Sequence, residues 1–456
     1  LTGFSPLVLG MSHAPAIWQT IDVPGEYQWL ESVDTPGGPC FLLDDGRLSL
    51  YAVDSGQLLW RVEASGQLVF WGDLFGNGNS VALLRQANRL FIIDGQSGQV
   101  CWSRTYDPPH VHLRVQVARV LPGTPGQQAA VFEQYGESGR LLNFEPNGTV
   151  DEVWRRQVLS NDVWPVRADH GCDIAFDLTA DDPIVWNVRH HRCQSFDART
   201  GAPLGCLEYE LEGAFRRNYG PWRIATGAGG QRAIAVASEM VQTHVHGLRL
   251  HADGTPELAW DRYYGEVYVV PGVAVEFLGV GDVDGDGTDE ILYNVRDPEN
   301  EFRSFVRARD VATGEVKHEL PDQWCSAVAR NVGGRTLLLT HPAPEGGTPA
   351  QGPLQLIEWQ TTGANILRTF DHGGPWGITT IPGQCGNDLL LRIIDEGATT
   401  LVRLDGDTLA EAERVTGGPL LASPIGACTR TTDGALHLAT GAGICRWPAG
   451  DLIPFD

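Results

Sequence analysis

Hydrophobic and polar residues alternate along the chain in short segments that end at turns containing glycine. The segments "RLSLYAVDSGQLLWRVEASG" from Arg47 and "RLFIIDGQSGQVCWSR" from Arg89 share one order: an alternating strand, a turn with glycine, and a second strand with Trp60 or Trp102. Alternation with a period of two predicts strands that bury one face, and glycine supplies the positive φ of a hairpin turn. The pattern therefore predicts a series of β-hairpins.

A second set of tryptophans marks another strand in the same unit. Each precedes a strand that leads through a short loop into an apolar strand such as "DEILYNV", which starts at Asp289. These tryptophans are Trp29, Trp164, Trp222, Trp324 and Trp376. The unit therefore holds four strands, and no amphipathic helical pattern interrupts the series.

Four-stranded antiparallel units in tandem predict a β-propeller, in which each blade buries its faces against its neighbours. Counting the first strand of each unit gives nine starts, near residues 29, 69, 114, 164, 222, 276, 324, 376 and 421. Propellers typically have about four to eight blades, so eight blades with one misread segment is the alternative, and an open array is another. The expected fold is all-β, a single propeller domain over residues 1–456.

The two ends of the chain suggest how the ring closes. The segment "APAIWQTIDVPGE" around Trp18 resembles the outermost strand of the unit but lacks three preceding strands, and the last unit ends in a weak strand, "DLIPFD". We therefore expect residues 1–25 to complete the last blade and to cover two free strand edges.

Charge limits the partners. The net charge of −24 repels phosphate backbones and anionic membranes, so we expect no nucleic acid partner. No apolar run approaches the roughly 20 residues of a membrane helix, so no membrane insertion is expected. Lys317 is the only lysine and lies outside any glycine-rich loop, which argues against a P-loop and a lysine Schiff base. A bound nucleotide is therefore not expected.

The nine cysteines form no C-x-x-C pair, so zinc and redox chemistry have no support. Most are expected to be small core residues. Cys172 and Cys193 are the preferred disulfide pair, because they can face each other across a hairpin. The chain begins at Leu1 with neither methionine nor a signal peptide, so we expect a processed or excised fragment.

The stretch "GDVDGDGTDEILY" from Gly281 crowds carboxylates between apolar segments. Three aspartates alternate in a D-x-D-x-D-G pattern, and a glutamate stands at the ninth position when the first of them is counted as position one. Oxygen ligands at this spacing suit calcium, whereas uncompensated carboxylates repel one another. The expected ligands of a structural Ca²⁺ are Asp282, Asp284, Asp286, Glu290 and the carbonyl of Thr288. An exposed acidic turn without metal is the alternative.

This stretch resembles the calcium loops of FG-GAP or VCBS repeats, which implies the same ligands and a solvent-facing Asp289. The "LFIIDGQSGQVCW" units resemble quinoprotein-like propeller repeats instead. A damaged copy of the loop, "GDLFGNGNSVALL" from Gly72, keeps Asp73 but has Phe75 and Asn77 at the next two ligand positions. We expect no metal in that copy.

The resemblance raises two enzymatic functions. Quinoprotein dehydrogenases of this repeat typically show a vicinal cysteine pair, which this chain lacks, so no PQQ cofactor is expected. Polysaccharide lyases are the better enzymatic alternative, because arginine can neutralise a uronate and tyrosine can move a proton. The residues for that role lie in "RRNYGPWR" and are Arg216, Arg217, Tyr219 and Arg223. Salt bridges between blades are their alternative role.

Three histidine pairs are further candidates, because alternate histidines on a strand share one face and can hold a metal. Exposed strand histidines are the commoner case. The pairs are His110 with His112, His190 with His191, and His244 with His246.

The second set of tryptophans, Trp29 and its four equivalents, forms a partial ring by symmetry. Exposed, these indoles are stacking platforms for sugars, and they are the candidate ligand-binding residues; buried, they are packing between blades. Their regular recurrence favours packing.

Together these features predict a non-catalytic, extracellular or surface-exposed propeller that binds protein or glycan partners and carries one structural Ca²⁺. A lyase of uronic-acid glycans is the second hypothesis, and a structural subunit of a surface assembly is the third. The expected calcium and disulfides favour a location outside the cytoplasm, which includes the periplasm.

Overall fold

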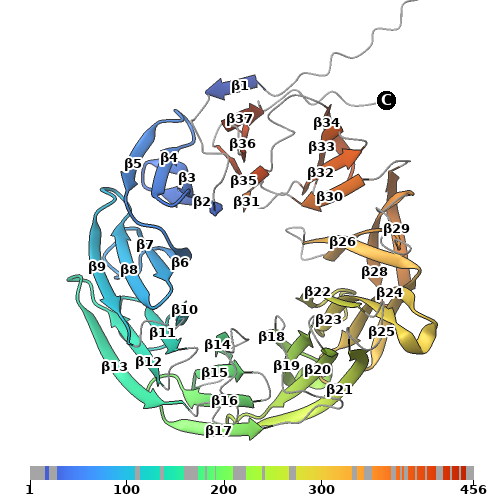
Figure 1. Cartoon of the computed structure of the whole chain (residues 1–456), viewed down its shortest axis with the longest axis horizontal. Coiled ribbons are helices and arrows are strands. Elements are labelled where there is room, and N and C mark those ends of the chain that lie inside the picture. Colours follow the sequence, from blue (N-terminus) through green and yellow to red (C-terminus); the bar gives the residue numbers. More distant parts are fainter. Residues whose placement is uncertain are drawn as a thin grey trace, which may run out of the picture.

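A computed structural model of the chain forms a ring of small antiparallel β-sheets around an open centre (Figure 1). The residues that it describes are 16–19, 28–107, 113–133, 138–158, 173–179, 182–189, 192–208, 222–238, 242–266, 274–330, 336–343, 352–370, 376–380, 383–384, 389–395, 398–405, 408–416, 425–431, 434–440 and 443–447.

Nine sheets make up the ring, and we number them as blades in chain order, each from the centre outward. Blades 1 to 3 are β2 (Trp29–Thr35), β3 (Gly38–Asp44), β4 (Leu48–Ala52) and β5 (Leu58–Val62); β6 (Gln67–Gly72), β7 (Val81–Gln86), β8 (Arg89–Asp94) and β9 (Val100–Thr105); and β10 (Leu113–Ala118), β11 (Gln128–Glu133), β12 (Ser138–Phe144) and β13 (Val150–Gln157). Blades 4 to 6 are β14 (Asp173–Asp177), β15 (Ile184–Arg189), β16 (Arg192–Asp197) and β17 (Pro203–Glu208); β18 (Trp222–Thr226), β19 (Arg232–Ser238), β20 (Gln242–Leu250) and β21 (Pro256–Glu266); and β22 (Ala274–Gly281), β23 (Glu290–Asp297), β24 (Arg303–Asp310) and β25 (Val316–Pro321).

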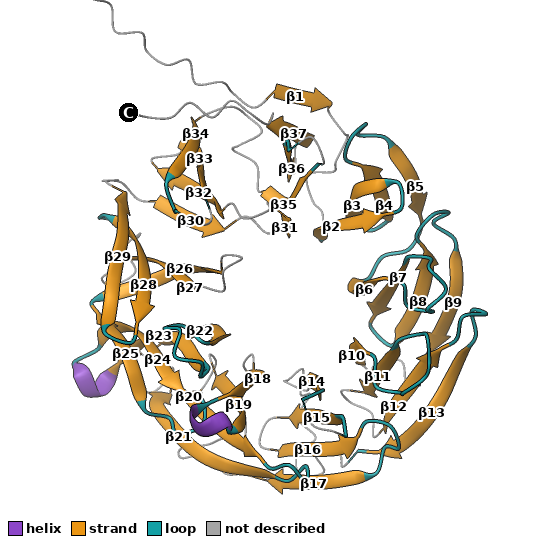
Figure 2. Cartoon of the chain, turned by 180° about the vertical axis from the view of Figure 1, so that it is seen from behind, coloured by secondary structure: helices purple, strands orange, loops and turns teal. Residues whose placement is uncertain are grey.

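Blades 7 and 8 are β26 (Gln323–Arg330), β27 (Thr336–Pro342), β28 (Leu354–Gln360) and β29 (Gly363–Phe370); and β30 (Trp376–Thr380), β32 (Leu389–Asp395), β33 (Ala398–Leu404) and β34 (Glu411–Thr416). Blade 9 is β35 (Ile425–Arg430), β36 (Leu436–Thr440) and β37 (Gly443–Trp447), flanked by β31 (Gly383–Gln384) and β1 (Ala16–Gln19). Figure 2 shows the only helices among the described residues, two short 3₁₀ turns at Ala228–Gly230 (η1) and Pro298–Asn300 (η2).

The prediction of an all-β ring with nine four-stranded blades is confirmed, and the eight-blade alternative is wrong. Seven of the nine predicted starts lie within two residues of a first strand. The exceptions are blade 9, whose first strand begins at Ile425, and blade 4, whose first described strand begins at Asp173. The predicted start near residue 164 lies outside the described residues.

The segment around Trp18 lies beside the last blade. Strand β1 runs antiparallel to β37, with Ala16 opposite Arg446 and Ile17 opposite Cys445. This pairing places β1 at the outer edge of blade 9 (Figure 1). That this strand closes the ring stays a prediction, which a truncation can test.

The hydrophobic core is divided among the seams between neighbouring blades. Between blades 1 and 2, Leu42 and Leu50 pack with Ala82 and Phe91, and all four side chains are almost completely buried. Burial on both faces explains why second strands such as β7 and β23 contain continuous apolar runs rather than alternating ones.

Tryptophans of the outer strands join one blade to the next. The Nε1 atoms of Trp60, Trp154 and Trp260 donate hydrogen bonds of 2.9, 2.9 and 3.0 Å to the carbonyls of Gly95, Ala198 and Val311, each in the following blade. A glycine at φ near +70° lies under each indole, and a Cβ there would approach the ring to 2.9 Å or less. The glycines are Gly98, Gly201 and Gly314. The repeated turn and the repeated tryptophan are therefore two halves of one contact.

The predicted Cys172–Cys193 disulfide is wrong, because Cys193 is a free thiol. Its side chain is completely buried among Trp186, Ile234 and their neighbours, in the seam between blades 4 and 5. Cys172 lies outside the described residues. Cys428 of β35 is disulfide-bonded. Among the described residues, no helix is long and apolar enough to cross a membrane.

Candidate cation site in blade 6

The acidic loop, residues 282–290, joins the first two strands of blade 6. It turns sharply because Gly285 and Gly287 adopt φ values of +78° and +86°, which side chains with a Cβ rarely adopt. The turn folds three carboxylates of the loop toward one another.

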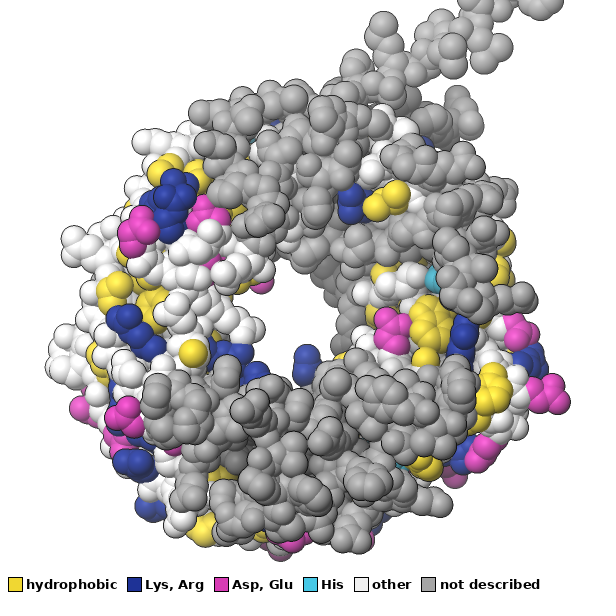
Figure 3. Space-filling model, viewed as in Figure 1, with side chains coloured by type: hydrophobic (Ala, Val, Ile, Leu, Met, Phe, Trp, Pro, Cys, Tyr) yellow, Lys and Arg dark blue, Asp and Glu magenta, His cyan; other side chains and the backbone are white. Residues whose placement is uncertain are grey.

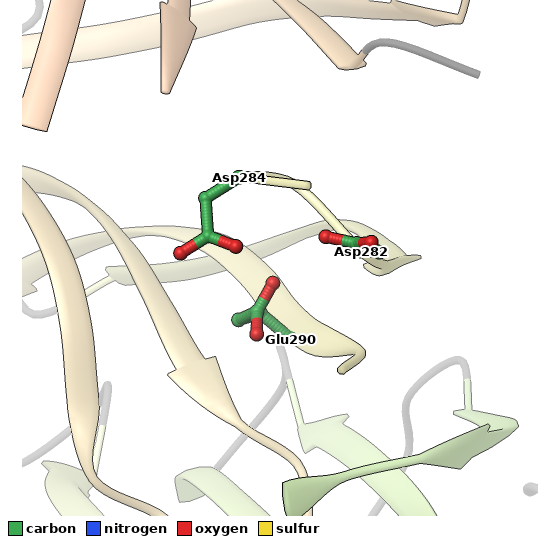
Figure 4. Close-up of side chains that lie close together, drawn as sticks. All are labelled: Asp282, Asp284 and Glu290. Atoms are coloured by element: carbon green, nitrogen blue, oxygen red, sulfur yellow. The ribbon is translucent and has the colours of Figure 1, made fainter. Parts of the chain in front are cut away.

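Asp282, Asp284 and Glu290 place carboxylate oxygens within 4.8 Å of one another (Figure 4). The two aspartates are half-buried, and Glu290 is completely buried. Hard oxygen donors at this separation fit a calcium ion, which takes six to eight oxygen ligands at about 2.3–2.6 Å. Three of the four carboxylates predicted as ligands therefore lie together, whereas Asp286 has a different neighbour.

That neighbour is Lys317 of the outer strand β25. Its ammonium group bonds Asp286 and lies 2.7 Å from Oε1 of Glu290 and 2.5 Å from Oγ1 of Thr288. The next residue, His318, lies with Nε2 at 2.6 Å from Oδ2 of Asp284. The only lysine in the chain is thus inserted among the predicted calcium ligands.

Hydrogen bonds already reach every oxygen of the four carboxylates. Asp282 accepts from the backbone N–H groups of Gly285 and Gly287 at 2.7 and 3.0 Å. Asp284 accepts one from Asp286, and Glu290 accepts one from Val283. The remaining oxygens face Thr288, Lys317 or His318. The loop is therefore held in shape by the chain itself.

The surroundings of Glu290, Asp286 and Lys317 shift the pKa values of all three side chains. Burial raises the pKa of Glu290 to about 7, although hydrogen bonds from Lys317 and Val283 oppose the change. For Asp286, partial burial acts in the same upward direction, but hydrogen bonds from Lys317 and Thr288 prevail and lower the pKa to about 2. The pKa of Lys317 stands well above its usual value, because contacts with Asp286 and Glu290 outweigh its burial.

The acidic loop contacts the blades on both sides. Toward blade 7, Val283 enters the seam with Trp359, His318 stacks on that indole at 5.5 Å, and Thr336 donates to the carbonyl of Asp282 at 3.2 Å. Toward blade 5, Oδ2 of Asp289 accepts from the N–H of Thr226 at 2.7 Å. The implied solvent orientation of Asp289 is therefore wrong, because this carboxylate binds the neighbouring backbone.

The damaged copy has the same turn with apolar contents. Asp73 accepts from the N–H groups of Asn77 and Gly78, as Asp282 does from its own loop. Phe75 is buried between blades 2 and 3 against Phe144, with ring centroids 5.8 Å apart, and Val81 stands where the acidic loop has Glu290. Replacement of the carboxylates by core residues explains how this turn folds with one carboxylate.

Two of the candidate ligand-binding tryptophans, Trp222 and Trp29, lie at seams between blades. Trp222 is 5% exposed and belongs to the core between blades 4 and 5. Trp29 is half-buried and donates to the carbonyl of Gly66 at 2.9 Å, and Trp324 is half-buried. Trp164 and the side chain of Trp376 lie outside the described residues.

Of the candidate lyase residues, the described part of the chain includes Arg223. Arg223 is exposed, with Nη1 2.7 Å from the carbonyl of Trp222. Arg216, Arg217 and Tyr219 lie outside the described residues.

Of the three candidate histidine pairs, the structure describes His244 and His246. His244 lies 2.9 Å from Asp261 and stacks on Tyr263, and burial lowers the pKa of His246 to about 4. The pairs at residues 110 and 112 and at 190 and 191 lie outside the described residues. Among the described residues, the acidic loop supplies the one group of three metal-binding side chains within ligand distance.

Sequence reasoning missed Lys317 and His318 as parts of the site. Lys317 was visible as the only lysine, but the strand that carries it follows the loop by 27 residues, and the sequence does not show which way its side chain points.

Residues 16–219 match a family of PQQ-like repeats described as outer membrane protein assembly factor BamB. This part of the chain is thus similar to PQQ-like repeats, and the chain folds as a β-propeller. No curated protein matches this propeller.

Solved structures with a similar fold include BamB from Moraxella catarrhalis, 12% identical over 88% of the propeller and 99% of that chain, with a TM-score of 0.43. A eukaryotic initiation factor is 12% identical over 90% of the propeller and 89% of that chain, with a TM-score of 0.48. Saccharomyces cerevisiae Sqt1 is 8% identical over 85% of the propeller and 96% of that chain, with a TM-score of 0.44. Identities this low carry no statement about function.

Proposed function

We propose that the protein is a non-catalytic binding module whose partner is another protein. The outer rim of the ring carries this proposal. Nine large apolar side chains of the described residues are exposed, and all but Leu178 and Phe302 lie on outermost strands. They are Leu58, Leu59, Val100, Val153, Leu204, Val316 and Ile366, which are 38–53% exposed. Hydrophobic side chains are visible around the margin of the ring in Figure 3.

The same strands have an unpaired edge. In eight blades the outermost strand is the last member of its sheet, so no further strand of the described residues pairs with its outward N–H and C=O groups. An extended segment of a partner can add to such an edge through main-chain hydrogen bonds, and apolar side chains on the edge strand give it specificity. Strand β1 pairs with β37 of blade 9 in this manner.

A protein partner fits this rim better than a glycan does. Sugars are recognised largely by exposed aromatic faces, whereas the exposed rim residues are aliphatic. The family that matches residues 16–219 is described as an assembly factor for outer membrane proteins, which supports the same choice. The position of Arg223 does not support the lyase alternative, because this side chain is exposed and contacts the carbonyl of Trp222.

We place the protein outside the cytoplasm, in the periplasm or at a surface. The disulfide at Cys428 supports this location, because disulfides persist in oxidising compartments. The description of the matching family supports it as well.

A structural calcium ion in the acidic loop is our second proposal. Asp282, Asp284 and Glu290 supply oxygen ligands, and Ca²⁺ binding there neutralises charge that one lysine leaves unbalanced. Because the loop touches blades 5 and 7, a bound ion strengthens two seams at once. The ion has no catalytic role in this proposal.

The binding proposal is tested with paired rim variants. The immobilised chain is exposed to an envelope extract of its source organism, and the expected result is one protein retained in stoichiometric amount. Val100→Asp combined with Ile366→Asp should abolish its retention. Ser103→Asp combined with Thr369→Asp, at exposed polar positions of the same strands β9 and β29, should not.

Retention that survives the apolar pair, or is lost equally in both pairs, contradicts a rim site. Release of unsaturated products from uronic-acid polysaccharides, followed by ultraviolet absorbance, would favour the lyase instead.

A further inference from the structure

Lys317 is a charged residue at a position where the other blades have uncharged residues. Each outermost strand has a β-bulge one residue before the position of Trp60, where the register with the third strand shifts by one residue. In β25 the bulged residue is Lys317, between Val316, which pairs with Arg309, and His318, which pairs with Ala308. The residues at the same bulge elsewhere are Trp18, Leu59, Cys101, Val153, Leu204, Ala259, Leu367 and Ala412.

The acidic loop of blade 6 and its damaged copy in blade 2 differ both in the loop and in the outer strand that faces it. In blade 6 the carboxylates of Asp284 and Glu290 face Lys317 and His318. In blade 2 the corresponding loop residues are Phe75 and Val81, and the corresponding outer-strand residues are Cys101 and Trp102. The carboxylates at these two loop positions and the basic side chains that face them are thus present together in blade 6 and absent together in blade 2.

A bulge turns a side chain away from the direction that regular alternation would give it. Here it brings the ammonium of Lys317 to three oxygen atoms of the acidic loop, with only 23% of the side chain exposed. Short contacts to Asp286 and Glu290 link the middle of the loop to its last residue through one cation. A metal ion bound to both carboxylates would make the same link.

We propose that Lys317 is the resident cation of the acidic loop, which holds the loop closed without metal and which calcium must oppose to bind. The second half of this inference rests on the calcium site proposed above. The ammonium neutralises only part of the charge of the four carboxylates, and it repels an incoming divalent ion. Calcium affinity is therefore weaker than the ligand set alone would give, which makes occupancy responsive to extracellular, millimolar calcium.

The test uses the full chain, Lys317→Met, the charge-retaining Lys317→Arg, and the control Arg47→Met. Arg47 is an exposed cation 3.5 Å from Asp45, so its loss changes the net charge equally without touching the loop. Melting temperature is measured in chelator and in millimolar calcium, and calcium affinity is measured by calorimetry.

We expect Lys317→Met to melt at least about 3 °C lower in chelator, while Lys317→Arg and Arg47→Met match the unmodified chain. Calcium should bind Lys317→Met about tenfold more tightly or better, and should restore its melting temperature. An unchanged melting temperature of Lys317→Met in chelator overturns the inference, whatever calcium does.

The remaining outcomes separate the two proposals. A lower melting temperature without calcium binding to any variant supports the resident lysine and overturns the calcium site. If calcium binds Lys317→Met and the unmodified chain with equal affinity, Lys317 does not oppose calcium binding, but the calcium site itself is still supported. If Lys317→Met does not fold in chelator, the polar variant Lys317→Gln, Asp286→Asn and their combination give the coupling between the partners, and zero coupling overturns the inference.

Discussion

The indole of Trp60 in blade 1 donates a hydrogen bond of 2.9 Å to the carbonyl of Gly95 in blade 2, and it lies against Gly98 of the same turn. A Cβ at Gly98 would meet the ring at 2.9 Å. The contact explains why one residue type recurs at the turn and another on the preceding outer strand.

Gly98→Ala should therefore destabilise the protein more than a glycine replacement in an equivalent open turn. Gly148 has φ of +84°, and a methyl group there would have no atom within 4 Å, so Gly148→Ala measures the backbone cost alone, about 1 kcal/mol. We expect about 2–4 kcal/mol for Gly98→Ala, because overpacking adds to that cost. Urea unfolding compares the two, and equal values would show that the indole yields freely.

Trp222 should contribute packing rather than glycan binding. Because its side chain is 5% exposed in the seam between blades 4 and 5, Trp222→Ala should cost about 3–5 kcal/mol. Trp71→Ala is the comparison and should cost less, since this half-buried indole packs at the edge of the core and donates to the carbonyl of Asp34 at 2.8 Å. A stable Trp222→Ala protein that loses binding on a glycan array, while Trp60→Ala keeps it, would restore the sugar platform.

Stability should fall as pH decreases from about 6.5 to 4, in part because of His246. Burial lowers its pKa from 6.5 to about 4, against the nearby charge of Asp261, while His244 acts in the same direction as burial. The unfolded chain binds the proton more strongly in this window, so the free energy of unfolding rises with pH and levels off above it.

The size of this effect is on the order of 3 kcal/mol, from about 1.4 kcal/mol per pKa unit. His246→Asn should flatten that part of the pH profile of urea unfolding, whereas His251→Asn, at an exposed position, should not. Parallel profiles of unfolding free energy against pH for the unmodified chain and both variants would show that His246 does not cause the pH dependence.

Strand β1 should stabilise the last blade by its pairing with β37. Removal of residues 1–25 is expected to lower the melting temperature by about 5 °C or more, because it exposes the edge of β37 and deletes the ladder. Removal of residues 1–12 retains β1 and is the control. An undisturbed melting temperature after the longer deletion would show that β1 does not close the ring.

Calcium should bind the acidic loop and not its damaged copy. Asp282→Asn is expected to weaken calcium binding by about tenfold or more, since it removes one of three convergent carboxylates. Asp73→Asn alters the matching position in blade 2, where Phe75 fills the core, and should leave the titration unchanged. Loss of binding in both variants, or in neither, would place the ion elsewhere.

The repeat made the fold predictable, because each blade has the same four-strand order and the same glycine turn before an outer-strand tryptophan. The apolar second strands and the nine-blade count followed from that order. Blade 4 was the weak point, since its start was assigned from Trp164 while its first described strand begins at Asp173.

The site was predictable only within its own loop. Spacing brought Asp282, Asp284 and Glu290 together, but Asp289 binds Thr226, 63 residues earlier, across a seam that no local pattern specifies. Lys317 reaches the loop through a bulge in β25, and a one-residue shift in register is not visible from alternation alone. Cys193 was misassigned for a related reason, because its direction into a seam depends on the neighbouring blade.

The central claim is that protein partners bind the outer rim of the ring. Photo-crosslinking in cells of the source organism tests it most directly, with the crosslinker placed in turn at Val100, Ile366 and, as an inner-strand comparison, Arg223. We predict that Val100 and Ile366 each crosslink to a protein partner and that Arg223 does not. Crosslinks from Arg223 alone, or to no protein from either rim position, would contradict the account.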